Sequence, residues 1–285
     1  MDDEVAGRDP VGGDVVKRHR LSTRIWHWVN FLALIVMLMS GLMIFNAHPR
    51  LYWGQYGANA DPAWLEIGQA QGDGYLRIGE ARIVTTGVLG LSQGANGQPN
   101  ARAFPSWITI PSGYSLAEGR RWHLAFAWVL AFGVLFYMAF SLFNGHVKRD
   151  LHIHKREWRP SHIWHDIKRH AKLKFPTGAA ARNYNMLQKL SYVGVIFILL
   201  PLMILTGLTM SPGIDAPWGL LLDVFGGRQS ARSIHFICAW TLVGFFIVHI
   251  LMVILAGPIN EIRSMITGRY RLPEERADEL QGESA

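Results

Sequence analysis

An arginine stands three residues before a histidine at the start of three long apolar runs, and this pairing constrains the fold more than any other feature. The copies are Arg24-Ile-Trp-His27, Arg120-Arg-Trp-His123 and Arg232-Ser-Ile-His235. A further histidine, His249, follows His235 by fourteen residues within one apolar run. Histidine is costly in the hydrocarbon core of a bilayer, so these four histidines are candidates for a functional role.

The apolar residues are gathered in four segments, each long enough to span a membrane, which takes roughly 20 residues. The sequence predicts spans at 24–45, 122–143, 187–210 and 233–256. The predicted connections are an arm at 1–23, an outer loop at 46–119, a basic linker at 146–182 and a tail at 257–285. We therefore expect an all-α integral membrane protein, a bundle of four transmembrane helices with a long extracytoplasmic loop. The first span lacks a signal-peptide cleavage pattern, so we expect it to be retained.

The distribution of Lys and Arg predicts the orientation of the spans. The linker at 146–182 carries ten of them, whereas the loops at 46–119 and 211–231 are poorer for their length. Because positive residues stay on the cytoplasmic side, we expect both termini and the linker to be cytoplasmic. The net charge of +7 is then a topology signal and not a sign of nucleic-acid binding. The single cysteine, Cys238, excludes a CxxCH haem attachment and a cysteine-ligated iron–sulfur cluster in this chain.

Four histidines at two depths predict two haem sites. In a helix, His235 and His249 are separated by about 21 Å along the axis and lie within about 40° of the same face. Depth then pairs His123 with His235 near the outer surface, and His27 with His249 near the inner surface. Neutral imidazole is a normal axial ligand of haem iron, so we predict two stacked, non-covalently bound haem b groups. The alternative is a non-redox anchor or transporter whose histidines relay protons.

The arginines one turn before the histidines are candidates for binding the haem propionates, because their planar fork suits carboxylates. Arg24 would serve the inner haem. Arg120 or Arg121, together with Arg232, would serve the outer haem. The alternative is that these arginines snorkel to the membrane surface and set the topology.

A second repeat lies late in the first and third spans. Met39-Ser40-Gly41-Leu42 is similar to Leu205-Thr206-Gly207-Leu208. Small residues let membrane helices approach closely, and they could equally leave room for a flat porphyrin. The sequence favours helix packing, and the two interpretations are compatible.

The outer loop at 46–119 is unusually long and holds Trp53, Trp64 and Trp107. Loops of this length are usually functional or disordered, and the aromatic content argues against disorder. We therefore predict a docking surface for an extracytoplasmic partner. The alternative is a self-packed cap over the outer haem.

The chain resembles the four-helix dihaem cytochrome b subunits of bacterial respiratory oxidoreductases. They include the gamma subunit of formate dehydrogenase, the cytochrome b of nickel–iron hydrogenase and the thiosulfate-reductase-type cytochrome b. The resemblance covers roughly residues 17–270 without most of the outer loop. It rests on the Arg-x-x-His copies, on His249 and on Asn185-Met-Leu-Gln188-Lys189 at the start of the third span.

The last of these elements resembles an Asn-x-x-Gln-Lys element beside the inner haem of the formate dehydrogenase gamma subunit, where it lines the menaquinone site. The resemblance implies that Asn185, Gln188 and Lys189 bind a membrane quinone, either ubiquinone or menaquinone. An apolar pocket with a few polar groups suits such a ligand. The alternative is that these residues cap the third helix and snorkel.

The resemblance implies an electron-transfer subunit of a respiratory chain, which anchors an extracytoplasmic redox enzyme and links it to the quinone pool. The expected partner is a molybdenum-cofactor (molybdopterin) oxidoreductase. The alternative function is a stand-alone b561-type oxidoreductase that acts on a small molecule such as superoxide. The sequence holds no nucleophile motif, P-loop or dinucleotide fingerprint, so we expect no catalytic residue independent of haem.

Overall fold

The computed structural model describes residues 11–94, 96–143, 186–211 and 219–273, with the single residues 161, 164, 168 and 213. The chain divides into two compact units. Unit 1 consists of Met1–Trp28, Tyr137–Ile198 and Val243–Ala285. Unit 2 consists of Val29–Phe136 and Leu199–Leu242.

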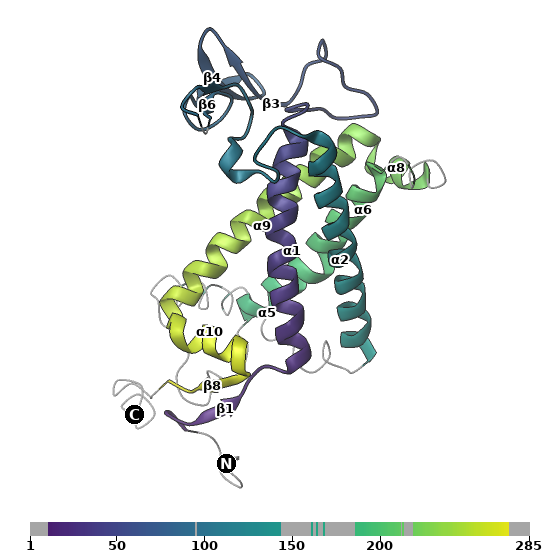
Figure 1. Cartoon of the computed structure of the whole chain (residues 1–285). Coiled ribbons are helices and arrows are strands. Elements are labelled where there is room, and N and C mark those ends of the chain that lie inside the picture. Colours follow the sequence, from purple (N-terminus) through teal and green to yellow (C-terminus); the bar gives the residue numbers. More distant parts are fainter. Residues whose placement is uncertain are drawn as a thin grey trace. The chain divides into compact units, whose positions relative to one another are not determined.

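Four helical stretches are long and apolar enough to cross a membrane (Figure 1). They are α1 (Leu21–Phe45), α2 (Leu116–Phe143), the stretch Met186–Thr209 and α9 (Arg228–Ala256). The expectation of a helical membrane protein with four spans is confirmed. Helices α1, α2 and α9 begin earlier than the predicted spans, because polar residues at the N-terminal end continue the backbone hydrogen bonding beyond the apolar stretch.

The third stretch is helical throughout but changes its winding in the middle. It consists of α5 (Met186–Val193), the π-helical segment η3 (Gly194–Leu199) and α6 (Leu200–Thr209). Pro201 explains the change, since it has no N–H and its ring would clash with the carbonyl of Phe197 in a regular α-helix. The wider turn directly before Pro201 lets the helix continue to Thr209.

The predicted outer loop of unit 2 is a folded β-structure. Its strands are β2 (Arg50–Leu51), β3 (Leu65–Ala70), β4 (Asp73–Ile78), β5 (Ala81–Val84), β6 (Ser92–Gln93) and β7 (Pro99–Asn100). The first four form an antiparallel sheet in chain order, and β6 pairs with β7. The 3-10 turn η1 (Ser106–Ile108) precedes α2. The all-α expectation therefore holds for the membrane helices and not for the loop, whose β-branched and aromatic residues suit a sheet.

The sheet packs against the end of α1. Leu51 and Ile67 from the sheet and Phe104 from the following segment share one buried cluster with Leu42 and Phe45 of α1. This packing agrees with the self-packed alternative for the loop. The docking surface stays a prediction.

A buried carboxylate holds the sheet together. Glu66 on β3 is 6% exposed and accepts hydrogen bonds from Arg50, Tyr75 and Arg77. Burial alone would raise the pKa of Glu66, but the hydrogen bonds from Arg77, Tyr75 and Arg50 lower it overall. Glu66 is therefore ionised and links three strands at neutral pH.

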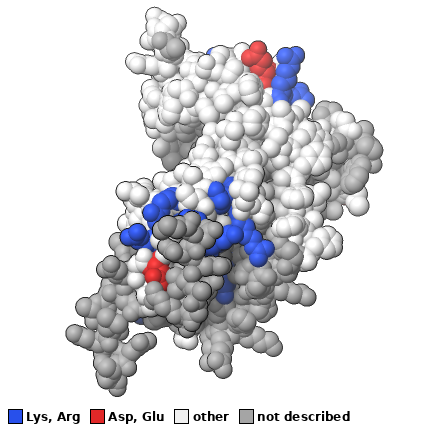
Figure 2. Space-filling view, turned by 60° about the horizontal axis from the view of Figure 1, so that its bottom comes forward, with Lys and Arg blue, Asp and Glu red and all other residues white. Residues whose placement is uncertain are grey.

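In unit 1 the segment before α1 pairs with the segment after α9. Strand β1 (Val15–Lys17) is antiparallel to β8 (Arg269–Arg271), which follows α10 (Pro258–Thr267). Figure 2 shows basic side chains gathered on the face that comes forward from the bottom of Figure 1. The described and exposed basic residues of unit 1 are Lys17, Arg20, Lys168, Arg263, Arg269 and Arg271. The short α8 (Gly219–Phe225) belongs to unit 2.

Candidate haem sites

The four predicted ligand histidines form two pairs, one in each unit. In unit 2 the ring centres of His123 and His235 are 6.3 Å apart, with the ring planes at 62°. In unit 1 the ring centres of His27 and His249 are 6.4 Å apart, with the planes at 56°. The pairing predicted from depth is therefore the one that the fold brings together.

Both separations suit two imidazoles on opposite sides of one metal atom. Two metal–nitrogen bonds of about 2 Å, plus about 1 Å from each nitrogen to its ring centre, give about 6 Å. Within the described residues, no group of three or more His, Cys, Asp or Glu side chains could hold a metal ion. A two-histidine site therefore suits a metal whose remaining ligands come from a porphyrin, as in haem.

The histidines of unit 2 make hydrogen bonds through Nδ1. His123 Nδ1 lies 3.1 Å from Ser40 Oγ and 3.1 Å from the Met37 carbonyl oxygen. His235 Nδ1 lies 3.0 Å from Thr206 Oγ1. These contacts leave Nε2 of each ring as the nitrogen for iron.

The histidines of unit 1 have aromatic neighbours. Trp28 packs edge-on against His27 with ring centres 5.1 Å apart, and its indole N–H donates to the Met265 carbonyl. Phe245 stacks on His249 at 5.8 Å. Among the described residues, His27 Nδ1 is buried without a hydrogen-bond partner. The two pairs thus have nearly equal spacing and different surroundings.

In unit 1, two arginine side chains have buried nitrogen atoms without hydrogen-bond acceptors among the described residues. Arg24 donates through Nη2 to the Ile266 carbonyl, but its Nε has no partner among the described residues. Arg18 Nε and Nη1 are also buried without hydrogen bonds there, although Glu261 Oε1 lies 3.5 Å from Arg18 Nη1. Buried charges need a counter-ion, so these guanidinium groups fit the propionate carboxylates of a haem held by His27.

Arg18 and His19 were not among the predicted site residues. Burial lowers the pKa of His19 to about 4, with smaller contributions from Arg18, His27 and Arg24, so His19 is neutral at neutral pH. The signal in the sequence was the basic run at 17–20 directly before the first span, which reads equally as a topology signal.

The arginines predicted for the outer haem have different environments. Arg232 donates to the carbonyl oxygens of His48 at 2.5 Å and Arg50 at 3.1 Å, so it ties α9 to the outer sheet. Arg120 and Arg121 are exposed in the N-terminal half of α2. Their role in binding propionates stays a prediction.

The predicted quinone residues are described only in part. Asn185 lies outside the described residues. Gln188 and Lys189 are half-buried at the start of α5, in unit 1. Their role in binding quinone stays a prediction.

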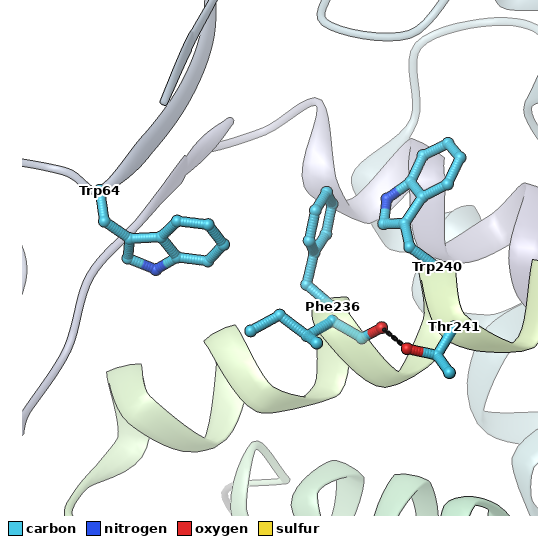
Figure 3. A pocket seen from close by; sticks show the side chains of 5 residues that line it. Trp64, Phe236, Trp240 and Thr241 are labelled. Atoms are coloured by element: carbon cyan, nitrogen blue, oxygen red, sulfur yellow. Dashed lines mark hydrogen bonds between the residues drawn. The ribbon is translucent and has the colours of Figure 1, made fainter. Parts of the chain in front are cut away.

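An apolar pocket of about 370 Å³ lies in unit 2, between the outer sheet and α9 (Figure 3). Trp64 faces Phe236 and Trp240 across it, and Ile237 and Thr241 complete the lining. Two of its polar atoms already have partners, because Trp64 Nε1 donates to Ser233 Oγ and Thr241 Oγ1 donates to the Ile237 carbonyl. The pocket therefore suits an apolar chain better than a polar head group.

Comparison with known proteins gives one family and two relatives. The family described as "Prokaryotic cytochrome b561" matches residues 18–268, a range that contains all four histidines. A "Putative protein-methionine-sulfoxide reductase subunit YedZ1" of Azospira oryzae is 25% identical over 232 residues, covering 81% of this chain and 87% of the relative. A "Probable Ni/Fe-hydrogenase B-type cytochrome subunit" of Azotobacter vinelandii is 25% identical over 169 residues, covering 55% of this chain and 70% of the relative. No solved structure matches the chain.

Proposed function

The chain belongs to the prokaryotic cytochrome b561 family, and we propose that it is a dihaem subunit that transfers electrons between membrane quinone and an extracytoplasmic redox enzyme. The observation that carries the proposal is the equal spacing of two separate histidine pairs, 6.3 Å and 6.4 Å. Haem b, which the family implies, supplies one-electron chemistry through the ferric and ferrous states of its iron.

The residues of each unit have distinct roles in this proposal. His123 and His235 hold the outer haem, and His27 and His249 hold the inner haem. Arg18 and Arg24 neutralise the propionates of the inner haem, because Nε of each side chain is buried without a hydrogen-bond acceptor among the described residues. The four helices are long and apolar enough to cross a membrane, which supports the proposal that both sites lie within it.

The proposed partner is a redox enzyme on the extracytoplasmic side, with both termini of this chain in the cytoplasm of a bacterial inner membrane. Both relatives are named as subunits of redox enzymes, which supports a partner. In the loop between β2 and β3, Trp53 and Tyr56 are 54% and 87% exposed, and Trp107 in η1 is 75% exposed. Aromatic side chains are enriched in protein interfaces, so this surface is the proposed docking site for a molybdenum-cofactor enzyme.

The haem count of purified variants tests the two sites. We expect two b haems per wild-type chain by pyridine haemochrome, and one in each of His123→Ala and His27→Ala. His48→Ala is the matched control, because His48 lies outside both pairs, and it should keep two haems. Loss of both haems in either variant, or of neither, would contradict separate sites.

Quinol-dependent reduction tests the other end of the path. In Gln188→Ala we expect slower haem reduction by a soluble quinol, with unchanged reduction by dithionite, because Gln188 would bond the quinone carbonyl. Equal rates in variant and wild type would remove Gln188 from the quinone site.

Purification from native membranes tests the partner. A co-purifying molybdenum enzyme supports it, whereas an isolated chain that turns over superoxide with quinol supports the stand-alone alternative.

A further inference from the structure

The two histidines of unit 2 are held by the same arrangement on two different helix pairs. Ser40 on α1 contacts His123 on α2, and Thr206 on α6 contacts His235 on α9. Both hydroxyl-bearing residues are completely buried. Hydroxyl groups with no access to water must be bonded within the protein, so their contacts are specific.

The hydrogen bonds fix the direction in which each proton is donated. Ser40 Oγ donates to the Val36 carbonyl at 2.6 Å, and Thr206 Oγ1 donates to the Leu202 carbonyl at 2.7 Å. A hydroxyl has one hydrogen, so each oxygen can only accept from the neighbouring imidazole. The Met37 carbonyl beside His123 Nδ1 can also only accept. Nδ1 therefore carries the proton, and the lone pair is on Nε2, the nitrogen required for iron.

A glycine follows each hydroxyl-bearing residue and lets the ring approach the helix. A Cβ added at Gly41 would stand 3.3 Å from His123 Cε1, and one at Gly207 would stand 3.4 Å from His235 Cε1. A larger residue at Gly41 would therefore displace the imidazole of His123 slightly, whereas at Gly207 a Cβ would just reach ordinary contact with His235. Each copy of the repeat noted in the sequence thus contacts one histidine of the pair, Ser40-Gly41 contacting His123 and Thr206-Gly207 contacting His235.

The repeat extends one turn further back than the sequence alone suggested. Met37 precedes Ser40 by three residues and Met203 precedes Thr206 by three. The Met37 carbonyl oxygen lies 3.1 Å from His123 Nδ1, and the Met203 carbonyl oxygen lies 3.2 Å from Thr206 Oγ1. His27 in unit 1 has no such arrangement, because its Nδ1 is buried without a partner among the described residues. The hydrogen-bonded support of Nδ1 is therefore a feature of the unit-2 pair and is absent at His27 among the described residues.

From this arrangement we infer that Ser40 and Thr206 are positioning residues that orient both ligands of the outer haem and lower its midpoint potential. The inference rests on the proposed dihaem function. An Nδ1–H that donates a hydrogen bond makes the imidazole more electron-rich at Nε2, which favours ferric over ferrous iron. The same bonds fix the rotation of each ring and so the angle between the two ring planes, which is 62°.

Redox titration and low-temperature EPR of the purified holoprotein test the inference. We expect Ser40→Ala and Thr206→Val each to raise the midpoint potential of one haem and to shift its low-spin EPR signal, with the second haem unchanged. The affected haem should be the one that His123→Ala removes. The conservative variants Ser40→Thr and Thr206→Ser keep the hydroxyl and should stay near the wild-type potential.

Thr241→Val is the matched control. Thr241 lies on α9, the helix that carries His235, and its hydroxyl donates to the Ile237 carbonyl one turn back without contacting a histidine. Unchanged potential and EPR signal in both Ser40→Ala and Thr206→Val, with both haems retained, would overturn the inference. A change in Thr241→Val of the same size would also overturn it. A wild-type chain without two haems would instead overturn the proposed function.

Discussion

Replacing Glu66 with Gln should loosen the outer sheet by an amount that its contacts define. Glu66 accepts five hydrogen bonds, from Nε and Nη2 of Arg50, from the hydroxyl of Tyr75, and from Nε and Nη2 of Arg77. The Gln side chain has the same shape, but it has one acceptor oxygen and no charge. Arg50 and Arg77 bond different oxygens of Glu66, so one of the two guanidinium groups would then face an amide N–H₂ group.

The cost is that of breaking a partly buried ion pair. Removing one partner of a buried pair costs about 3–5 kcal/mol. The side chains of Arg50 and Arg77 are 28% and 32% exposed, so water replaces part of the lost interaction. We therefore expect a loss of about 2–3 kcal/mol in the free energy of opening the sheet.

Hydrogen–deuterium exchange measures this loss at the strands themselves. A change of about 2–3 kcal/mol lowers the protection factors roughly 30- to 150-fold for amides that exchange through local opening. The amides to follow are those of β3 and β4. Glu80→Gln is the control, because Glu80 is exposed in the turn between β4 and β5. Protection equal to wild type in Glu66→Gln, or an equal loss in Glu80→Gln, would refute the reasoning.

The same residue predicts a pH dependence. The folded-state pKa of Glu66 is lowered, so its contribution to stability is fully present above the ordinary glutamate pKa of about 4.3. The contribution is lost as the pH falls through the folded-state pKa. Protection of the wild-type strands should therefore fall on acidification below that range, and Glu66→Gln should lack this part of the fall.

Three further changes have defined outcomes. Arg18→Gln should alter the optical and redox signals of the haem that His27→Ala removes and spare the other haem, because Arg18 is buried in unit 1. Gly41→Ala should shift one low-spin EPR signal by displacing the ring of His123, whereas Gly244→Ala, which has open space around it, should not. Trp64→Phe removes the 2.9 Å bond to Ser233 and should weaken the protection of β3 by about 1 kcal/mol in hydrogen exchange.

The membrane helices and the histidine pairs could be predicted because both follow from helix periodicity. An apolar run long enough to span a bilayer needs no tertiary information to be recognised. Fourteen residues are close to four turns, so His235 and His249 share one face wherever the helix lies. The partners of these two histidines followed from the direction of each span.

The supporting contacts could not be predicted, because they join residues far apart in the sequence. Ser40 and His123 are 83 positions apart, and Thr206 and His235 are 29 positions apart. The sequence showed that Ser40-Gly41 and Thr206-Gly207 were similar, but small residues also serve ordinary helix packing. Only the fold shows that a hydroxyl meets an imidazole at each copy.

The Arg-x-x-His pattern is regular in the sequence, but the arginines that it contains have different environments in the structure. Arg232 has the same offset from its histidine as Arg24, yet its guanidinium donates to two carbonyl oxygens of the outer loop. Arg24 is buried beside Arg18, which comes from a strand-paired arm that no helical pattern predicts. The sequence offset fixes the helix face, and the loops decide what that face meets.

The different surroundings of the two pairs predict an order of potentials. In unit 2 the hydroxyl and carbonyl acceptors around Nδ1 favour ferric iron. In unit 1, His27 Nδ1 lacks such an acceptor among the described residues, and the buried guanidinium groups of Arg18 and Arg24 favour the ferrous form, which carries one positive charge less. If the chain holds the two proposed haems, both effects make the haem of His123 and His235 the lower-potential one, so a shared electron should reside mainly on the haem of His27 and His249. A redox titration should therefore show that His27→Ala removes the higher-potential wave, and removal of the lower-potential wave would reverse this assignment.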